Sequence, residues 1–189
     1  SCLDLELVQP TKQQIICSRS FGHKVTDKRE LREAIAKYTA RAAEKLRGEK
    51  RLCRVVSVFI RTSPFIPNEP QYSKTLSAEL PTPTDDTRDL LEVSNALFCR
   101  IYRAGYRYAK GGMMLADFYE HGVFQQDLFL RNSQRENTKH LMEVIDCINH
   151  SGLGSIFFAA QGTTPQWTMK REHLSPAYTT RWKDLPRVW

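Results

Sequence analysis

Residues 73–80, with the sequence SKTLSAEL, constrain the fold most strongly because their polar and apolar side chains alternate with a period of two. Such alternation is typical of a β-strand that buries one face and exposes the other. One face carries Lys74, Leu76, Ala78 and Leu80, and the other carries Ser73, Thr75, Ser77 and Glu79. The chain therefore has to form a sheet that is covered on one side, while the other side meets water or a partner.

A long amphipathic segment, residues 26–50, predicts a helix that covers this sheet. Thr26 or Asp27 can cap its N-terminus, and Glu30 can complete a capping box. The apolar stripe of the helix is Leu31, Ile35, Tyr38, Ala42 and Leu46. We expect the charged residues on its other faces to be solvated and to form i,i+4 pairs.

The remaining segments give the order of the elements. Side chains that favour extended backbone predict strands at 15–22, 52–63 and 106–118. A second helix begins at Asp85 or Asp86 and ends near Gly105, and its apolar residues are Leu90, Leu91, Leu97, Phe98 and Ile101. The order β-α-β-β-α-β over residues 15–119 predicts an α+β domain, a four-stranded antiparallel sheet with two helices on one face.

Prolines and glycines mark interruptions in this pattern. The sequence PTPTDD is expected to end the strand at residue 80. The pair Gly111-Gly112 in the last strand indicates either a bulge or a close approach of another part of the chain. Sequence alone does not decide between these two.

The chain beyond residue 119 is predicted to form a linker and a small second unit. Residues 120–137 have the composition of a linker, and residues 138–189 predict a small α/β C-terminal domain. This domain should begin with an amphipathic helix over 138–152 and continue with a strand at SIFFAAQG, residues 155–162. The helix residues expected to face inward are Leu141, Ile145 and Ile148.

The residue types that enzymes use for metal or phosphate chemistry lack the spacing that this chemistry requires. The histidines have no metal-ligand spacing, and the chain has neither a Gly-rich phosphate loop nor a nucleophile elbow. Asp85 and Asp86 favour helix capping over catalysis, whereas a Ser-His-Asp triad stays open because its members need not be close in sequence. The sequence predicts no catalytic residue, metal site or cofactor in this chain.

Cysteine usage and hydropathy indicate a compartment. Five cysteines without a C-x-x-C pair argue against a disulfide framework or a structural zinc site and favour a reducing cytosol. No apolar stretch approaches the roughly 20 residues that cross a bilayer, so no membrane contact is predicted. The start SCLDLELVQPTKQQ does not resemble a signal peptide, and the missing initial Met predicts an excised fragment.

Binding chemistry is better represented than catalytic chemistry. The net charge of +7 is compatible with a polyanion partner and also with none. The segment SRSFGHK could hold phosphate oxygens through hydroxyls, cations and the backbone near Gly22, or could be a plain strand-to-helix turn. The residues of this possible surface are Ser18, Arg19, Ser20, Gly22, Lys24, Ser73, Lys74, Thr75, Arg107, Tyr108 and Lys110. Binding by such groups would be sensitive to salt and indifferent to nucleotide sequence.

Two parts of the chain resemble a known family. SRSFGHKVTDKRELREAIAKYTARAAEKLR, followed by RVVSVFIRTSPF, resembles the little-finger domain of Y-family DNA polymerases. It is most similar to the UmuC family, the catalytic subunits of bacterial DNA polymerase V and their plasmid-borne relatives. FFAAQG and WTMKREHLSPAYTTRW resemble the additional C-terminal domain of that family. The resemblance runs from about Gln13 to Trp189, and residues 1–14 resemble the tether from the polymerase thumb.

The resemblance implies that the open sheet face grips the backbone of primer–template DNA. By position, a phosphate-contacting turn would comprise Ser18, Arg19, Ser20, Phe21 and Gly22, and the strand contacts would be Ser73, Lys74, Thr75 and Lys110. The catalytic carboxylates and Mg ions of the parent DNA-directed DNA polymerase would lie in its palm, fingers and thumb. This fragment is therefore expected not to be an enzyme by itself.

Residues 125–129, QQDLF, match the pentapeptide by which bacterial polymerases bind the sliding clamp, Gln-x-(Ser/Asp/Asn)-Leu-Phe. The match implies that Leu128 and Phe129 enter an apolar pocket of the clamp while the Gln125 amide is hydrogen-bonded. Asp127 occupies the third position of the motif. This interpretation explains why large apolar side chains occur in a linker.

The family also implies a biological setting. The parent would copy damaged DNA with low fidelity in the SOS response, in the bacterial cytoplasm and associated with the nucleoid. Its expected accessory partners are the cleaved UmuD dimer and RecA, which residues 138–189 could contact. The alternative is a stand-alone ferredoxin-like RNA- or protein-binding module. An RNA binder should carry stacking aromatics on its central strands, and residues 73–80 offer Ser and Thr instead.

Overall fold

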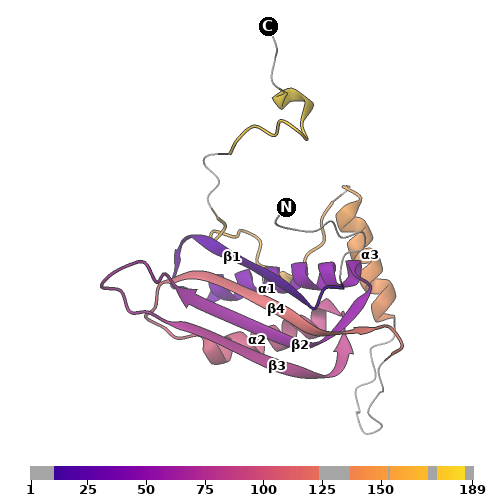
Figure 1. Cartoon of the computed structure of the whole chain (residues 1–189), viewed down its shortest axis with the longest axis horizontal. Helices are drawn as coiled ribbons and strands as arrows, with labels where there is room; N and C mark the ends of the chain where they lie inside the picture. The colour runs from indigo at the N-terminus through magenta and orange to yellow at the C-terminus, as the bar shows by residue number, and fades with distance from the viewer. Residues whose placement is uncertain (1–10, 124–136, 153, 170–173, 186–189) are drawn as a thin grey trace, which may run out of the picture.

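The computed structural model describes residues 11–123, 137–152, 154–169 and 174–185 (Figure 1). Its elements are β1 Gln14–Val25, α1 Lys28–Gly48, β2 Arg51–Thr62, β3 Ser73–Thr84, α2 Thr87–Ile101, β4 Tyr108–Glu120 and α3 Thr138–His150, with two short 3-10 helices, η1 Ala159–Gln161 and η2 Trp182–Asp184. The first six elements follow the order β-α-β-β-α-β, which confirms the predicted α+β fold.

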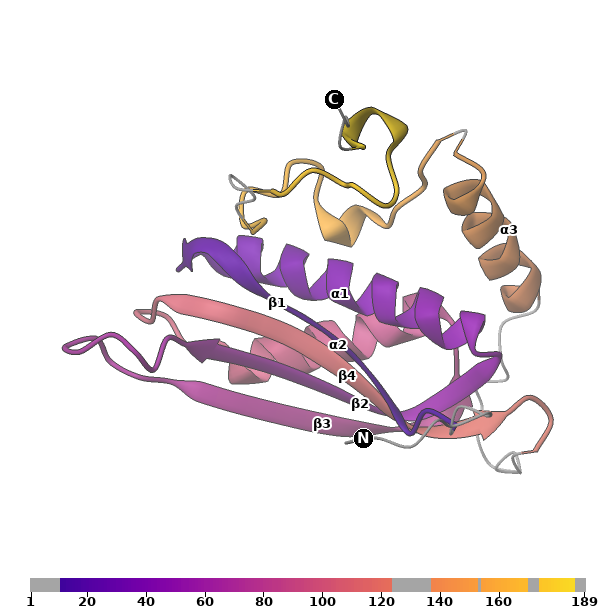
Figure 2. The same cartoon turned by 45° about the horizontal axis from the view of Figure 1, so that its top comes forward.

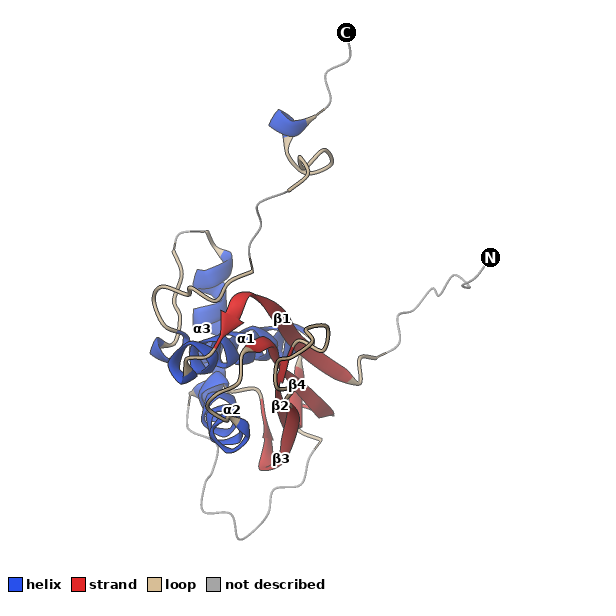
Figure 3. Ribbon diagram, turned by 90° about the vertical axis from the view of Figure 1, so that its left-hand side faces the viewer, coloured by secondary structure: helices blue, strands red, loops and turns tan. Residues whose placement is uncertain are grey.

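The four strands form one antiparallel sheet in the order β1-β4-β2-β3. Helices α1 and α2 both pack on one face of this sheet, so helices and strands form two layers (Figure 3). The core lies between the layers, where Met113, Val58 and Leu31 are fully buried. The opposite face carries no helix, and it is the only sheet face among the described residues that is free for a partner.

Both helices begin at predicted aspartates. The Asp27 carboxylate accepts a hydrogen bond from the Arg29 N–H (3.2 Å), and the Asp86 carboxylate accepts one from the Arg88 N–H (2.8 Å). These bonds satisfy backbone donors that have no partner within the helix. The predicted stripe of α1 is also confirmed, because Leu31, Ile35, Tyr38, Ala42 and Leu46 are all buried.

The Gly111-Gly112 pair is a place of close approach. A Cβ atom on Gly111 would lie 3.1 Å from Phe21 Cζ and 3.5 Å from Ile35 Cδ1, so the missing side chain lets α1 and Phe21 pack against β4. Strand pairing runs through both glycines without a shift. Of the two possibilities that the sequence left open, the structure therefore has the close approach.

The prediction that PTPTDD ends the third strand is wrong, because β3 continues through Pro81 and Pro83 to Thr84. Strand β3 is at the edge of the sheet, where one side of the backbone has no neighbouring strand. Proline is tolerated there because its missing N–H can face away from the ladder.

The C-terminal region follows the prediction only in its helix. In α3 the buried residue is Met142, whereas Leu141, predicted to face inward, is 41% exposed. The predicted strand at 155–162 is wrong: this segment contains the 3-10 helix η1 and has no strand. Beyond it, the Trp167 ring is buried against Phe21 and against Tyr38 of α1. The described chain that follows α3 runs along the side of the molecule where α1 lies (Figure 2).

Candidate nucleic-acid interface

The free face of the sheet is built from residues that lie in register across all four strands. Residues paired directly across a ladder point to the same side of a sheet. The first row on this side is Ser20, Lys110, Arg61 and Ser73, and the second is Ser18, Gly112, Phe59 and Thr75. The neighbouring residues Cys17, Met113 and Val58 are buried under the helices, so these rows point away from the helices. We call the two rows the outer-face rows.

The outer-face rows combine cations with hydroxyl groups. Lys110 and Arg61 lie side by side on the two central strands, with Ser20 and Ser73 on the edge strands at either end. Neither row contains a carboxylate. The next two rows are Ile16, Met114, Ser57 and Ser77, and then Gln14, Ala116, Val55 and Glu79. Positive charge is therefore concentrated at the end of the face near the loop of residues 63–72.

Phe59 lies across Gly112 within the second row. A Cβ atom on Gly112 would come within 2.7 Å of Phe59 Cζ and 2.3 Å of Ser18 Cβ, so only glycine leaves room for the ring. The Phe59 side chain is consequently partly buried against the backbone of β4. It fills the face between the hydroxyls of Ser18 and Thr75.

Two of the predicted contact residues are held by one acidic side chain. The Glu69 carboxylate accepts hydrogen bonds from Lys24 Nζ (3.0 and 3.1 Å) and from Arg107 Nη1 (2.8 Å). The two cations lie near the charged end of the outer face, but their charges are partly offset by Glu69. Lys110 and Arg61, by contrast, have no ion-pair partner among the residues that the structure describes.

Arg19 and Lys74 are on the other side of the sheet. They belong to the row Arg19, Gly111, Ile60 and Lys74, whose central members pack under the helices. Both side chains are exposed because each lies on an edge strand. The predicted surface therefore splits, with Ser18, Ser20, Ser73, Thr75 and Lys110 on the outer face and these two cations at its edges.

Tyr108 is not on the surface, and its prediction as a contact residue is wrong. It is fully buried, and its hydroxyl donates a hydrogen bond to the Arg103 carbonyl oxygen (2.9 Å). Burial also raises the pKa of its phenol. The cause is a bulge: Lys110 pairs with Arg61 but Tyr108 pairs with Thr62, so Ala109 is an extra residue that turns Tyr108 into the core.

The segment of residues 18–22 is part of a strand and not the predicted turn, since β1 continues to Val25. The Phe21 side chain is buried against Gly111 and Trp167, and so it does not reach the outer face. The Gly22 N–H, expected to hold a phosphate oxygen, donates to the Trp167 carbonyl oxygen instead (3.2 Å). The side chains of this segment remain available to a ligand, as do the backbone groups on the side of this edge strand that faces away from β4.

Sequence reasoning missed Arg61 and Phe59 as members of the outer face. Both lie in the predicted strand 52–63, where the alternation of exposed and buried residues is a local signal. The alternation is weak, because Ser57 points to the same face as Phe59 and Arg61 but is buried. Its hydroxyl forms a hydrogen bond with Ser77 across the ladder (2.7 Å). The sequence does not show which strand lies beside which.

The predicted clamp-binding residues Gln125, Asp127, Leu128 and Phe129 lie outside the described residues. Their role stays a prediction. Within the parts of the chain that are described, no group of three or more His, Cys, Asp or Glu side chains is placed to hold a metal ion. No helix in these same parts is long and apolar enough to cross a membrane.

Two family descriptions match the chain. The impB/mucB/samB family C-terminal domain matches residues 12–128, which include the whole sheet, both of its helices and the start of the linker. A domain of unknown function (DUF4113) matches residues 139–188.

Curated relatives match nearly the whole chain. Protein UmuC of Salmonella typhimurium is 52% identical over 188 residues, covering 99% of this chain and 44% of the relative. Protein ImpB of Salmonella typhimurium is 50% identical and protein MucB of Escherichia coli 44% identical, each over 186 residues. The chain thus spans less than half the length of these relatives.

Among solved structures, an insertion ternary complex of Dbh DNA polymerase is similar, with a TM-score of 0.45 and 10% identity over 59% of this chain and 31% of that one. A complex of the β-clamp processivity factor and the little-finger domain of PolIV gives a TM-score of 0.41 and 17% identity, over 62% of this chain and 99% of that one.

Proposed function

Because the chain belongs to the impB/mucB/samB family, we propose that it is the DNA-binding C-terminal region of an error-prone translesion DNA polymerase of the Y family. The observation that carries this proposal is the first outer-face row, in which Lys110 and Arg61 lie side by side between two serines. A sheet face with cations in its centre and hydroxyls at its edges suits the backbone of primer–template DNA.

The proposed contacts address phosphate and sugar groups and leave the bases unread. Lysine and arginine neutralise phosphates, and serine and threonine hydroxyls donate to phosphate oxygens without base discrimination. The surface consists of Ser18, Ser20, Arg61, Ser73, Thr75 and Lys110, with Lys24 and Arg107 available when Glu69 releases them. Contacts of this kind tolerate distorted template bases, and a polymerase that copies damaged templates requires such tolerance.

A second proposed contact is with the sliding clamp, through Gln125, Leu128 and Phe129. The QQDLF sequence supports it, because two adjacent large apolar side chains in a polar linker can serve as anchors for an apolar pocket. The flanking polar residues would let the peptide reach the clamp while the outer face holds DNA.

For the parent protein, we propose a DNA-directed DNA polymerase that acts in the SOS response in the bacterial cytoplasm. Its catalytic carboxylates and Mg ions would belong to the part of the relatives that this chain does not span. The cleaved UmuD dimer and RecA are proposed as accessory partners. These proposals rest on the family and on no contact within this chain.

The DNA proposal is tested by fluorescence anisotropy of the full 189-residue chain with a primer–template duplex over a salt series. The variant Lys110→Gln/Arg61→Gln should reduce the slope of log affinity against log salt by roughly 1.8, because two phosphate contacts are lost. The control Arg32→Gln/Arg100→Gln removes the same charge from exposed positions on α1 and α2, and it should bind nearly as the wild type does.

Equal losses of DNA affinity in both double variants would show that net charge, and not the outer face, determines binding.

The RNA-module alternative is tested in the same assay with single-stranded RNA. Phe59 is an aromatic on a central strand, so an RNA binder should prefer certain bases and lose affinity in Phe59→Leu. A preference for RNA over primer–template DNA would contradict the proposed function.

The clamp contact is tested with purified clamp and the variant Leu128→Ala/Phe129→Ala. Removing both anchors should weaken binding by at least roughly 2–4 kcal/mol, whereas the flanking control Leu130→Ala should retain most of the affinity. Unchanged binding in the double variant would exclude the pentapeptide as the contact.

A further inference from the structure

A cavity of about 560 Å³ lies along the edge strand β1, on the side of α1. Strand β1, helix α1 and the segment around Trp167 form its walls, and η1, which precedes that segment, lies near α1 (Figure 2). The cations that line it are Arg19, Lys37, Arg41 and Lys45. Among the described residues, no carboxylate lines it, although α1 carries several glutamates. We call this cavity the basic cleft.

The charge of the basic cleft is not offset by any carboxylate of the described residues, and only Lys37 among its cations lies over an aromatic ring there, with Nζ 5.6 Å from the Trp167 centroid. Of the four other cations of α1, two are paired, Arg29 with Glu33 (3.1 Å) and Arg47 with Asp146 (2.6 Å). No ion pair joins the four cleft cations to a carboxylate within the described residues. Three of them, on α1, repeat every four residues, which places them on one face with a rise of about 6 Å per step. A row of this kind suits a ligand with regularly repeated negative charges.

Two buried donors at the basic cleft also lack a partner. The Tyr38 hydroxyl and Trp167 Nε1 have no hydrogen-bond partner among the described residues, and the two side chains are 6% and 3% exposed. Both residues line the cleft, and their rings pack edge to face with centroids 5.6 Å apart. Burial raises the pKa of Tyr38 to about 12, so the phenol keeps its proton. Its hydroxyl can therefore donate a hydrogen bond to an anion. Buried polar groups usually have a partner, and a ligand oxygen would supply one.

Strand β1 connects the basic cleft to the outer face. Ser18 belongs to the second outer-face row and also lines the cleft, while the next residue, Arg19, points to the helix side. Strand β1 is an edge strand, so no other strand of the sheet blocks the path from one side to the other. A chain of phosphates on the outer face could continue past Ser18 into the cleft.

We propose that the basic cleft binds the phosphates of a single nucleic-acid strand that leaves the DNA held on the outer face. Lys37, Arg41 and Lys45 would neutralise successive phosphates, and the Tyr38 and Trp167 donors would bond a phosphate oxygen. The volume of about 560 Å³ suits one strand and not a duplex. The inference rests on the proposed DNA-binding function, and it adds a second site on the opposite side of the sheet.

The test measures binding of the full 189-residue chain to a blunt duplex, to the same duplex with a single-stranded overhang, and to the single strand alone. Wild type should bind the overhang substrate more tightly than the blunt duplex. Lys37→Gln/Arg41→Gln should leave the blunt affinity unchanged and reduce this gain by roughly 25-fold at 0.1 M salt, with a salt slope lower by about 1.4, because two of the phosphate contacts are lost. Arg32→Gln/Arg100→Gln removes equal charge outside the cleft and should keep the gain.

Tyr38→Phe provides a second, milder variant. It removes one unpaired hydroxyl and keeps the ring, so the melting temperature without DNA should stay the same or rise. Binding of the overhang should weaken by about tenfold, since one hydrogen bond to a charged group is lost. A lower melting temperature with unchanged overhang binding would show that the hydroxyl has a structural role and would overturn its assignment.

The outcomes separate this inference from the proposed function. If the blunt duplex binds and the overhang adds nothing, the cleft inference fails and the proposed function stands. If only the single strand binds, and the cleft variant abolishes that binding, the cleft inference stands and the proposed function fails. Equal losses in the cleft variant and its charge control, or binding of polyglutamate in place of the single strand, would overturn the inference.

Discussion

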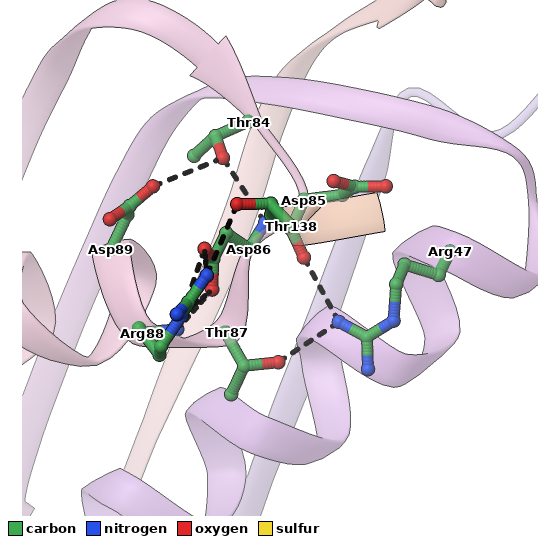
Figure 4. Close-up of polar contacts among 8 residues, drawn as sticks. All are labelled: Arg47, Thr84, Asp85, Asp86, Thr87, Arg88, Asp89 and Thr138. Atoms are coloured by element: carbon green, nitrogen blue, oxygen red, sulfur yellow. Dashed lines mark hydrogen bonds and ion pairs between the residues drawn. The ribbon is translucent and has the colours of Figure 1, made fainter. Parts of the chain in front are cut away.

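Arg47 joins three elements, and its replacement should release α3 from the domain. The guanidinium donates through Nε and Nη2 to the Asp146 carboxylate of α3 (2.6 and 2.7 Å). Through Nη1 it donates to the Asp85 carbonyl oxygen and to the Thr87 hydroxyl at the start of α2 (both 2.9 Å) (Figure 4). The Arg47 and Asp146 side chains are only 11% and 22% exposed. Sequence analysis predicted solvated charges on this part of α1, and for Arg47 that prediction is wrong.

The energy of this contact lies between two known limits. Exposed ion pairs contribute about 0–1 kcal/mol, and breaking a buried pair costs about 3–5 kcal/mol. Because both partners of the Arg47–Asp146 pair keep some exposure, Asp146→Asn should lower the free energy of unfolding by roughly 1–2 kcal/mol. Arg47→Met should cost roughly 2–4 kcal/mol, since it also removes both contacts to the start of α2.

Urea unfolding of the full chain gives the total loss, and hydrogen exchange followed by mass spectrometry locates it. In Asp146→Asn, amides of residues 138–150 should exchange faster, while amides of the four strands keep their protection. In Arg47→Met, amides at the start of α2 should lose protection as well. Glu143→Gln serves as the control, because it removes a carboxylate from an exposed position on the same helix.

Unchanged exchange of α3 in Asp146→Asn would refute the reasoning. It would mean that the other contacts of α3, namely the burial of Met142, the Arg88–Thr138 hydrogen bond and the His150–Glu44 contact, attach the helix to the domain without the ion pair. A double-variant cycle tests the same point, because Arg47→Met/Asp146→Asn should cost less than the sum of the single variants by roughly 1 kcal/mol or more.

Three further predictions follow from local packing and ionisation. A Cβ atom at Gly112 would lie 2.3 Å from a side-chain carbon of β1, so Gly112→Ala should lower the free energy of unfolding by roughly 1–3 kcal/mol. The control Gly48→Ala should not lower it, because a Cβ atom there would meet nothing within 4 Å. Burial raises the pKa of Asp85, so the folded protein binds a proton there more tightly than the unfolded chain does, and stability falls as pH rises through that pKa. Asp85→Asn should therefore be more stable than wild type in urea at pH 7, with the difference vanishing in acid below the usual aspartate pKa. Burial raises the pKa of Cys53 to about 12, so iodoacetamide at pH 8 should alkylate exposed Cys99 and leave Cys53 unmodified, as read by mass spectrometry.

The layered fold could be predicted because its signals are local. Alternation in residues 73–80 and the stripe from Leu31 to Leu46 each mark one buried face, and together they require helices on one side of a sheet. The errors come from long-range context. Pro81 and Pro83 stay in a strand because β3 is an edge strand, and sequence does not show strand order. The apolar run at 155–162 predicted a strand, yet Ile156 and Phe157 are about half exposed and the segment has no strand partner among the described residues.

The site could be predicted in part for the same reason. Ser73 and Thr75 follow from local alternation, and Lys110 follows from the polar end of its strand and from the resemblance. Arg61 could not be found, because its place beside Lys110 depends on the pairing of β2 with β4. Tyr108 was misplaced because a single extra residue, Ala109, reverses the direction of the side chain, and a bulge leaves no mark in this composition.

The way in which Phe59 is packed explains why the outer face would hold a backbone without reading bases. On open sheets that read single-stranded RNA, aromatic rings on the central strands stack on bases. Here Gly112 has no side chain, so the ring of Phe59 lies against the backbone of β4, partly buried, and fills a hollow. The groups that project beyond it are the hydroxyls of Ser18 and Thr75 and the neighbouring cations. These groups bond phosphate oxygens whatever the base, so a distorted template base would change few of the proposed contacts.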